Sequence, residues 1–411
     1  MKSPVVVVLC LFLGAPASAL ELDVRGKLFG VGTALPEESL QRQVSGTPAY
    51  DYTVDLRLMF KQDAGRFSFG AHYDLIANGG DSYAYLTNPG VTLDQSATSD
   101  RFRLMDLTWN VDSGDRHQIV QRLDRLALQY RGATWGFVLG REAVSWGSGI
   151  VFQPMDLISP FAPTTVDTDF KNGDDMLVVD KLFADGSDLQ FLAVARRDLE
   201  NDVTTDVASG ALKWRKFLGG VEFELFGARH YEDQVYGGSL RIPIGGALLR
   251  SDLVATKLDA GGEWYVSGVL NADVSFDLGG RTTYVFAEYY HNDFGVSSLP
   301  ESVLLLPEPL TERLARGEVF TLMRDYLAAG GSIQWHPLWT QSLTVIGNLN
   351  DGSGLVQSAV SYVPSDQATL EGGFTWSIGD PGEEYGGIPL LGDGATTGGA
   401  FQTYLRWVYY F

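Results

Sequence analysis

The sequence predicts an all-β protein: a single transmembrane antiparallel β-barrel of about 18 strands, within a range of roughly 16 to 20. Apolar and polar residues alternate in segments of about ten residues, the length a tilted strand needs to cross a membrane. Aromatic residues lie near segment ends, as in the interfacial girdles of membrane barrels. The alternative fold is an exported soluble β-sandwich. Many polar-face positions are charged, and charged side chains are tolerated in a water-filled lumen but not in the dry core of a sandwich.

Residues 1–19 have the pattern of a secretory signal peptide. Lys2 precedes an apolar run at 5–13, and Ala17 and Ala19 flank Ser18 in a small-residue cleavage site. The run is too short to span a bilayer as a helix. We therefore expect residues 20–411 to form the transmembrane barrel with long extracellular loops, and Cys10, the single cysteine, to leave with the signal.

A two-residue period runs through the chain to its last residue. In the final segment Leu405 and Trp407 fall on one parity, and Gln402 and Arg406 fall on the other. Successive strand side chains point to opposite faces, so each such segment has an apolar face and a polar face. The same alternation occurs at 22–28, 52–60, 67–75, 264–277, 327–336, 369–378 and 401–411.

Short turns and long polar stretches separate these segments. Turns rich in Gly and Asp are expected at 62–65, 112–115, 184–187 and 278–281. Longer stretches lie at 36–48, 78–100, 145–174, 293–323 and 379–399. This pattern fits periplasmic turns at one end of a barrel and extracellular loops at the other. The region 101–144 permits two topologies. The barrel must close, because an open edge in lipid leaves backbone groups unpaired.

The composition excludes several classes of protein. Lys and Arg number 30 against 51 Asp and Glu, a net charge of -21, which argues against nucleic-acid binding. One cysteine cannot build a disulfide scaffold or a cysteine-ligated metal site. With 22 Phe, 18 Tyr and 9 Trp the chain is too aromatic to be disordered. We expect no cofactor and no metal.

The polar faces of the segments supply candidate pore-lining residues. The candidates are Asp55, Arg57, His72, Asp74, Arg125, Glu222, Glu224, Asp273, Asp277 and Glu371. Acids outnumber bases in this set, which predicts a mild cation preference. His72 is interpreted as lumen lining. His72 and Asp74 lie two residues apart on one face, within reach of a hydrogen bond to each other. Glu222 and Glu224 are interpreted as wall lining rather than as an acid–base pair.

The stretch at 145–174 carries aromatic and proline residues, which suits a loop that folds back and packs. It is predicted to lie in the lumen as a constriction loop; the alternative is an outer loop packed over the rim. Its acids would then face inward bases such as Arg57 and Arg125 and set a field across the pore. These acids are Asp156, Asp167, Asp169, Asp174 and Asp175. The spacing from Asp167 to Gly173 is one residue out of register for a calcium loop, so no metal site is assigned.

The signal, the alternation and the terminal Tyr409-Tyr410-Phe411 resemble Gram-negative outer-membrane β-barrel proteins of the porin kind. The resemblance implies that Phe411 belongs to a signal read by the barrel-assembly machinery. Residues 139–175, with Ser145-Trp146-Gly147-Ser148-Gly149 and Phe152-Gln153-Pro154, resemble a segment of poorly characterised proteobacterial barrels, some of which accompany multihaem cytochromes. That second resemblance implies a channel or a sheath and no catalytic residues.

The leading functional hypothesis is a passive channel for small hydrophilic solutes or ions in the outer membrane. One alternative is a sheath around an exported partner such as a multihaem cytochrome; the chain has no Cys-x-x-Cys-His and cannot carry haem covalently itself. The other alternative is an outer-membrane hydrolase, for which no Gly-x-Ser-x-Gly elbow is present. We therefore expect a protein that is not an enzyme and that contacts membrane lipid and the assembly machinery.

Overall fold

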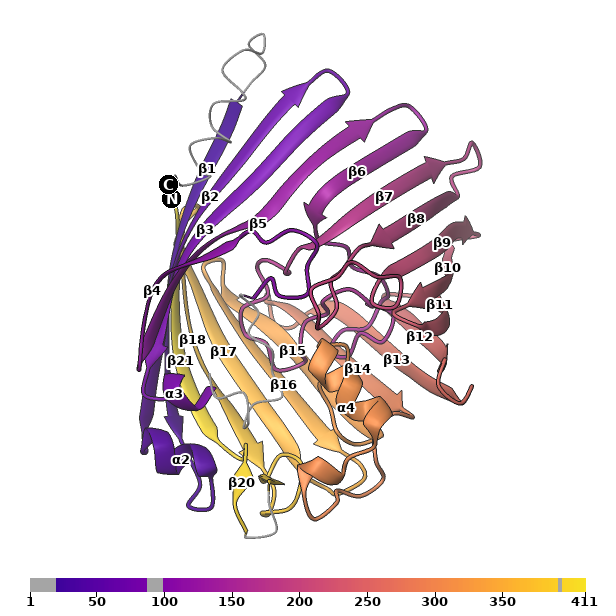
Figure 1. Ribbon diagram of the computed structural model, residues 1–411. Coiled ribbons are helices and arrows are strands. Elements are labelled where there is room, and N and C mark those ends of the chain that lie inside the picture. The colour runs from indigo at the N-terminus through magenta and orange to yellow at the C-terminus, as the bar shows by residue number, and fades with distance from the viewer. Residues whose placement is uncertain (1–19, 87–98, 391–393) are drawn as a thin grey trace.

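A computed structural model describes residues 20–86, 99–390 and 394–411 and has the form of one β-barrel (Figure 1). The predicted signal peptide and part of the predicted loop at 78–100 lie outside the described residues. The strands of the barrel sheet are β1 (Leu20–Ala34), β2 (Ala49–Ala64), β3 (Phe67–Gly80), β4 (Thr108–Gly114), β5 (His117–Arg131), β6 (Trp135–Glu142), β7 (Asp174–Leu182), β8 (Asp188–Val194), β9 (Ser209–Leu218), β10 (Val221–His230), β11 (Asp233–Ile244), β12 (Ala247–Lys257), β13 (Trp264–Asp277), β14 (Thr282–Asn292), β15 (Asp325–His336), β16 (Trp339–Asn348), β17 (Gly354–Ser365), β18 (Ala368–Ile378) and β21 (Phe401–Tyr410).

The barrel closes on itself in an antiparallel circuit. β1 pairs with β2 along one edge and with β21, the last strand, along the other. Nineteen strands join the sheet, but β4 pairs only with the first half of β5, whose second half pairs with β6. β3 pairs directly with β5, so eighteen strands form the closed circuit. The predicted closed barrel and its strand number are confirmed.

The remaining elements lie in the long connections. These connections carry α2 (Leu40–Ser45), α3 (Tyr83–Leu86), η1 (Val303–Leu305), α4 (Glu308–Arg316) and the small pair β19 (Ile388–Pro389) and β20 (Thr396–Thr397). In the part of the chain that the structure describes, no helix combines the length and apolarity needed to cross a membrane.

All strand connections at one end of the barrel are short turns. The other end carries the long loops, together with a few short connections such as residues 231–232 between β10 and β11. The predicted turns near 62–65, 184–187 and 278–281 connect β2 to β3, β7 to β8 and β13 to β14 at the short-turn end. The fourth, at 112–115, differs. It forms the tip of the β4–β5 hairpin inside the connection at 81–116, and Gly80 N donates to Arg116 O beside it. It therefore lies at the loop end, because β4 is an accessory strand rather than a member of the circuit.

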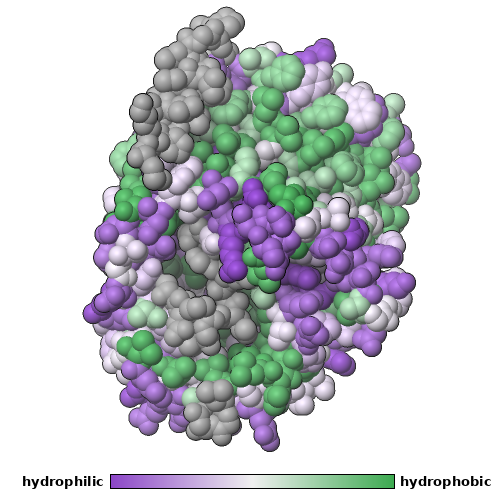
Figure 2. Space-filling view, viewed as in Figure 1, coloured by the Kyte–Doolittle hydropathy of each residue, from purple (hydrophilic) through white to green (hydrophobic). Residues whose placement is uncertain are grey.

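The two faces of the strands differ as the alternation predicts. On β1, Leu22 and Leu28 point outward with 56% and 47% of their surfaces exposed, whereas Arg25 between them points inward and is 1% exposed. Figure 2 shows hydrophobic side chains gathered on the strands toward the short-turn end and hydrophilic ones around the loops. An exposed apolar outer face on a closed sheet is the surface of a membrane-spanning barrel.

Candidate functional site: a charged constriction in the lumen

A bulge in β5 brings one group of charges together. His72 pairs with Arg125 and Tyr73 pairs with Leu123, so Asp124 is an extra residue with no partner on β3. A bulge of this kind exchanges the inward and outward parities along its strand. As a result Arg122, Asp124 and Arg125 are all buried inside the barrel.

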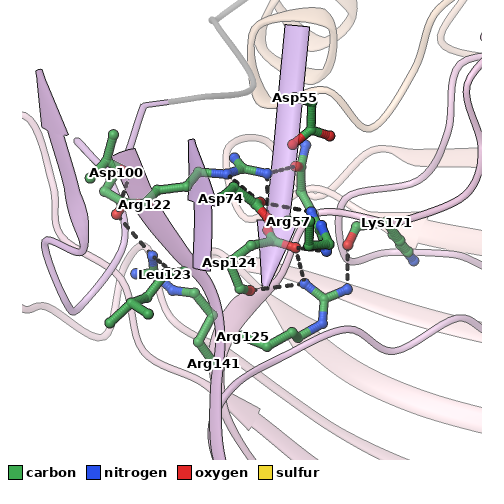
Figure 3. A network of polar contacts seen from close by, with 12 residues as sticks. Asp55, Arg57, Asp74, Asp100, Arg122, Leu123, Asp124, Arg125, Arg141 and Lys171 are labelled. Atoms are coloured by element: carbon green, nitrogen blue, oxygen red, sulfur yellow. Dashed lines mark hydrogen bonds and ion pairs between the residues drawn. The ribbon is translucent and has the colours of Figure 1, made fainter. Parts of the chain in front are cut away.

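Asp124 is the centre of a buried ion-pair network (Figure 3). Its carboxylate accepts from Arg57 Nη1 at 3.1 Å, from Arg122 Nη2 at 3.0 Å and from Arg125 Nη1 at 2.8 Å. Asp74 accepts from Arg57 Nη2 at 2.7 Å and from Arg122 Nε at 3.3 Å. Charges removed from water are stable only when they are paired in this way.

The connection between β6 and β7, residues 143–173, contains the stretch that the sequence predicts as a constriction loop. A clasp joins its two ends: Lys171 Nζ donates to Val144 O at 2.5 Å, to Ser145 Oγ at 3.1 Å and to Asp156 Oδ2 at 2.6 Å. Burial raises the pKa of Asp156 to about 6, although the Lys171 ammonium beside it acts in the opposite direction. The loop is therefore a compact unit built around its own ion pair.

The middle of this loop is attached to the wall formed by β7 to β14. Glu288 on β14 accepts from the backbone N–H groups of Ile150, Val151 and Phe152 at 2.6, 2.9 and 2.8 Å. Asp252 on β12 accepts from Ser148 N and Oγ, both at 2.6 Å. Apolar packing accompanies these bonds. The buried cluster formed by loop and wall includes Trp146, Met155, Ile158, Val178, Leu192, Phe226, Val235 and Val254.

The end of the loop reaches the opposite wall, formed by β17, β21, β1 and β2. Gln357 Nε2 donates to Thr164 O at 2.9 Å. Asp167 pairs with Lys27 and Arg406, and Asp169 pairs with Arg25 and Arg406. The loop therefore contacts walls on both sides of the barrel and crosses the lumen, whereas a loop packed over the rim would leave these inward side chains uncovered.

The next two loop residues, Phe170 and Lys171, contact arginines of β1, β2 and β5. The guanidinium carbons of Arg57 and Arg25 lie 4.0 and 5.0 Å from the centre of the Phe170 ring, within the range of cation–π contacts. Arg125 donates to the backbone carbonyl of Lys171. The end of the loop is therefore joined to the Asp124 network.

The structure places most of the predicted pore-lining residues inside the barrel. Asp55, Arg57, Asp74 and Arg125 lie at or beside the network described above. On the opposite wall, Glu222 accepts from Arg241 Nη1 at 2.6 Å, Glu224 lies 3.8 Å from Lys213 Nζ, and Asp273 pairs with Arg250. Glu371 accepts from Tyr404 Oη at 3.2 Å.

Two of the predicted residues, Asp277 and His72, lie apart from these ion pairs. Asp277 lies at the end of β13 next to the short turn, where it is exposed and accepts from Gly280 N at 2.9 Å, away from the loop that crosses the barrel. The hydrogen bond between His72 and Asp74 does not form. Arg57 and Arg122 both donate to Oδ2 of Asp74, whereas Asp74 Oδ1 and His72 Nδ1 have no hydrogen-bond partner among the described residues. The His72 ring instead meets the edge of Phe170, with 6.1 Å between ring centres.

Three of the five loop acids also differ from expectation. Asp156 pairs with Lys171 of its own loop and not with a base of the wall. Asp174 and Asp175 begin β7 and are buried against wall arginines rather than facing Arg57 or Arg125. Asp174 accepts from Arg196 Nη2 at 2.9 Å, and Asp175 accepts from Arg141 Nε at 2.9 Å. Their role in the structure is to hold the base of the loop.

Several residues of the constriction were not selected from the sequence. Arg25, Lys27 and Arg406 fall on the polar parity of their segments, so the alternation could have identified them. Arg122 and Asp124 could not be assigned in this way, because the bulge changes the parity within β5. The loop lysine Lys171 has no periodic signal in the sequence.

A Ser–His–Glu arrangement lies elsewhere on the wall. Ser209 Oγ is 2.8 Å from Nδ1 of His230, and His230 Nε2 is 3.1 Å from Glu318 Oε1. The serine is 7% exposed, the histidine 4%, and Arg196 Nη1 donates to the serine oxygen at 2.7 Å. A buried oxygen that already accepts this bond is poorly placed to attack a substrate. The arrangement fastens the loop at 293–324 to β9 and β10.

The described residues contain no group of three or more His, Cys, Asp or Glu placed to hold a metal ion. Asp167 and Asp169, the acids of the calcium-like spacing, are instead paired with cations of the wall.

Solved structures share this architecture. A BenF-like porin from Pseudomonas fluorescens Pf-5 matches with a TM-score of 0.56 and 12% identity, over 95% of this chain and 98% of that chain. The barrel has a porin fold. OccAB1 of Acinetobacter baumannii matches at 0.54 and 8% identity, over 95% and 96%. OpdK of Pseudomonas aeruginosa, solved with vanillate, matches at 0.53 and 12%, over 95% and 98%.

No protein-family model matches the chain, and no curated protein matches its sequence. At these identities the likeness concerns the fold. The neighbours are porins, and the comparisons do not support the resemblance of residues 139–175 to cytochrome-associated barrels.

Proposed function

We propose that the protein is a passive channel of the outer membrane for small hydrophilic solutes or ions. The observation that carries the proposal is the loop at 143–173, which crosses a closed barrel and presents partly exposed carboxylates to the lumen. A loop fixed to both walls limits the size of a solute, and its charges select among those that fit. The porin fold of the neighbours supports the same function.

Liposome swelling tests this proposal. The purified barrel, reconstituted into phospholipid vesicles, is mixed with sugars and amino acids of increasing size. We expect swelling that is fast for the smallest solutes and falls with solute size, because a crossing loop narrows the path. Swelling no faster than that of protein-free vesicles would refute the channel.

The mild cation preference remains part of the proposal. The acids of the loop are more exposed than the cations they pair with: the Asp167 and Asp169 side chains are 27% and 29% exposed, against 1% for Arg25 and 8% for Arg406. Ions in the lumen would therefore meet carboxylates first. A reversal potential measured across a salt gradient would decide between cation and anion preference.

The proposed partners of the barrel are membrane lipid and the assembly machinery. The apolar outer face would contact lipid. Phe411 is 73% exposed, and its N–H donates to Val24 O at 2.9 Å at the short-turn end. This exposure is compatible with recognition by the assembly machinery, which stays a prediction from the sequence. No observation favours a cytochrome sheath or a hydrolase over a channel.

A further inference from the structure

Two loop acids cover a cluster of cations on one wall of the lumen. Arg25 and Lys27 on β1 and Arg406 on β21 come from adjacent strands. We propose that Asp167 and Asp169 are the residues that determine charge selectivity, because they mask a wall that would otherwise attract anions. This inference rests on the proposed channel function.

The arrangement of exposure supports a mask. The loop carboxylates are more than a quarter exposed, whereas the side chains of Arg25, Lys27 and Arg406 are 1%, 12% and 8% exposed. The cations therefore lie behind the acids as seen from the lumen. A permeating ion would experience the field of the outermost charges most strongly, since nearby opposite charges behind them partly cancel.

The charge balance of the cluster changes sign when the mask is removed. On the wall itself, Asp55 lies 3.6 Å from Arg25 Nη1 and 3.3 Å from Lys27 Nζ, and Glu371 acts electrostatically on Arg406. With Asp167 and Asp169, four acids oppose three cations. Without the two loop carboxylates, three cations oppose two acids, and the local net charge passes from negative to positive.

The remaining contacts of the loop do not depend on these two acids. The Lys171 clasp, the Glu288 and Asp252 anchors and the packing of Phe170 on Arg57 are unaffected by exchanging Asp for Asn at 167 and 169. The exchange also keeps the side-chain volume. A loop that stays in place isolates the effect of charge from the effect of pore width.

The other loop acids serve a different purpose. Asp156 is paired with Lys171 of the same loop. Asp174 and Asp175 are buried against Arg196 and Arg141. Of the five acids predicted for the constriction, Asp167 and Asp169 are therefore the two that can set selectivity directly.

The test is the reversal potential of single channels in planar bilayers under a potassium chloride gradient. For Asp167→Asn with Asp169→Asn, we expect the chloride-to-potassium permeability ratio to rise about threefold or more, with intermediate values for each single variant. The shift should shrink in molar salt, where charges are screened within about 3 Å. Heat-modifiable migration in gels verifies that each variant is a folded barrel.

Two further variants make the test specific. Adding Lys27→Gln and Arg406→Gln to the double variant restores the original local charge, so selectivity should return to that of the unmodified channel. Asp273→Asn removes a carboxylate paired with Arg250 on the opposite wall and should shift the ratio much less.

The outcomes are distinguishable. If the unmodified protein forms no channels, the proposed function itself fails. If it conducts and the double variant keeps the same permeability ratio, or Asp273→Asn shifts the ratio equally, the mask is wrong and the channel function stands.

Discussion

Asp124 carries three arginine contacts on a single carboxylate, and every member of the group is buried. Arginine suits this position because its planar donors can serve two acids at once, as Arg57 does for Asp74 and Asp124. The interior gains no stability from such charges unless each is paired. The network therefore fixes the positions of β2, β3 and β5 and supports the wall that the loop meets.

Asp124→Asn tests this interpretation. The amide removes the charge that balances Arg57, Arg122 and Arg125, so we expect the free energy of unfolding to fall by about 3 kcal/mol or more. Equilibrium urea unfolding in phospholipid vesicles measures it. Asp185→Asn, at an exposed turn beside Lys216, is the control and should leave stability close to that of the unmodified protein. Equal stability of the two variants would show that the network is dispensable.

Side-chain parity predicts Asp55, Arg57, Asp74 and Arg125 at the constriction, because each points inward on a half-exposed strand. It fails where local geometry breaks the period. The bulge at Asp124 places both Asp124 and Arg125 on the inner face of β5. Asp277 is the last residue of β13 and lies beside the turn that follows. The position of a bulge and the end of a strand depend on pairing between segments far apart in the sequence. The two-residue period of one segment therefore does not predict them.

At the scale of elements, the long loops are docked into the barrel rather than extended from it. Glu384, from the connection at 379–400, accepts from Leu322 N and Asn348 Nδ2, both at 2.7 Å, and from Tyr326 Oη. Its own N–H donates to Asp351 at 2.9 Å. One carboxylate therefore joins this loop to the one at 293–324 and to β15 and β16. Figure 1 shows α4 of that second loop close to β14 and β15.

This contact should respond to pH. Burial raises the pKa of Glu384 from 4.5 to about 7, so between these values the docked loop holds a proton that a released loop loses. Docking of the loop is therefore strongest below about pH 4.5, weakens as the pH rises to about 7 and is constant above that pH. The free energy of docking changes by up to about 3 kcal/mol over this range.

Hydrogen exchange measured at pH 5 and pH 8, after correction for intrinsic rates, reports this difference. We expect the amides of 320–324 and 383–388 to be less protected at pH 8, and Glu384→Gln to remove the pH dependence. Protection that is independent of pH in the unmodified protein would exclude this role for Glu384.

At the scale of the whole molecule, alternation explains how an acidic chain of neutral mean hydropathy enters a membrane. Apolar side chains cover the outer face, and the charges pair inside. Closure, strand number and the separation of turns from loops follow from the period and the turn chemistry. The path of the constriction loop does not, because it depends on Glu288, Asp252 and Lys171 meeting partners far apart in the sequence. The aromatic and proline residues of 145–174 predict a loop that packs in the lumen, but a loop packed over the rim stays an alternative from the sequence alone.

Single-channel conductance in planar bilayers tests the central claim, a channel narrowed by a crossing loop. The reference is a variant in which residues 147–169 are replaced by a short Gly-Ser linker, verified as a folded barrel by heat-modifiable migration. We predict discrete, stable current steps from the unmodified protein and clearly larger steps from the reference, because the linker leaves the lumen open. The absence of steps from the unmodified protein, or steps of equal size from both, would contradict the account.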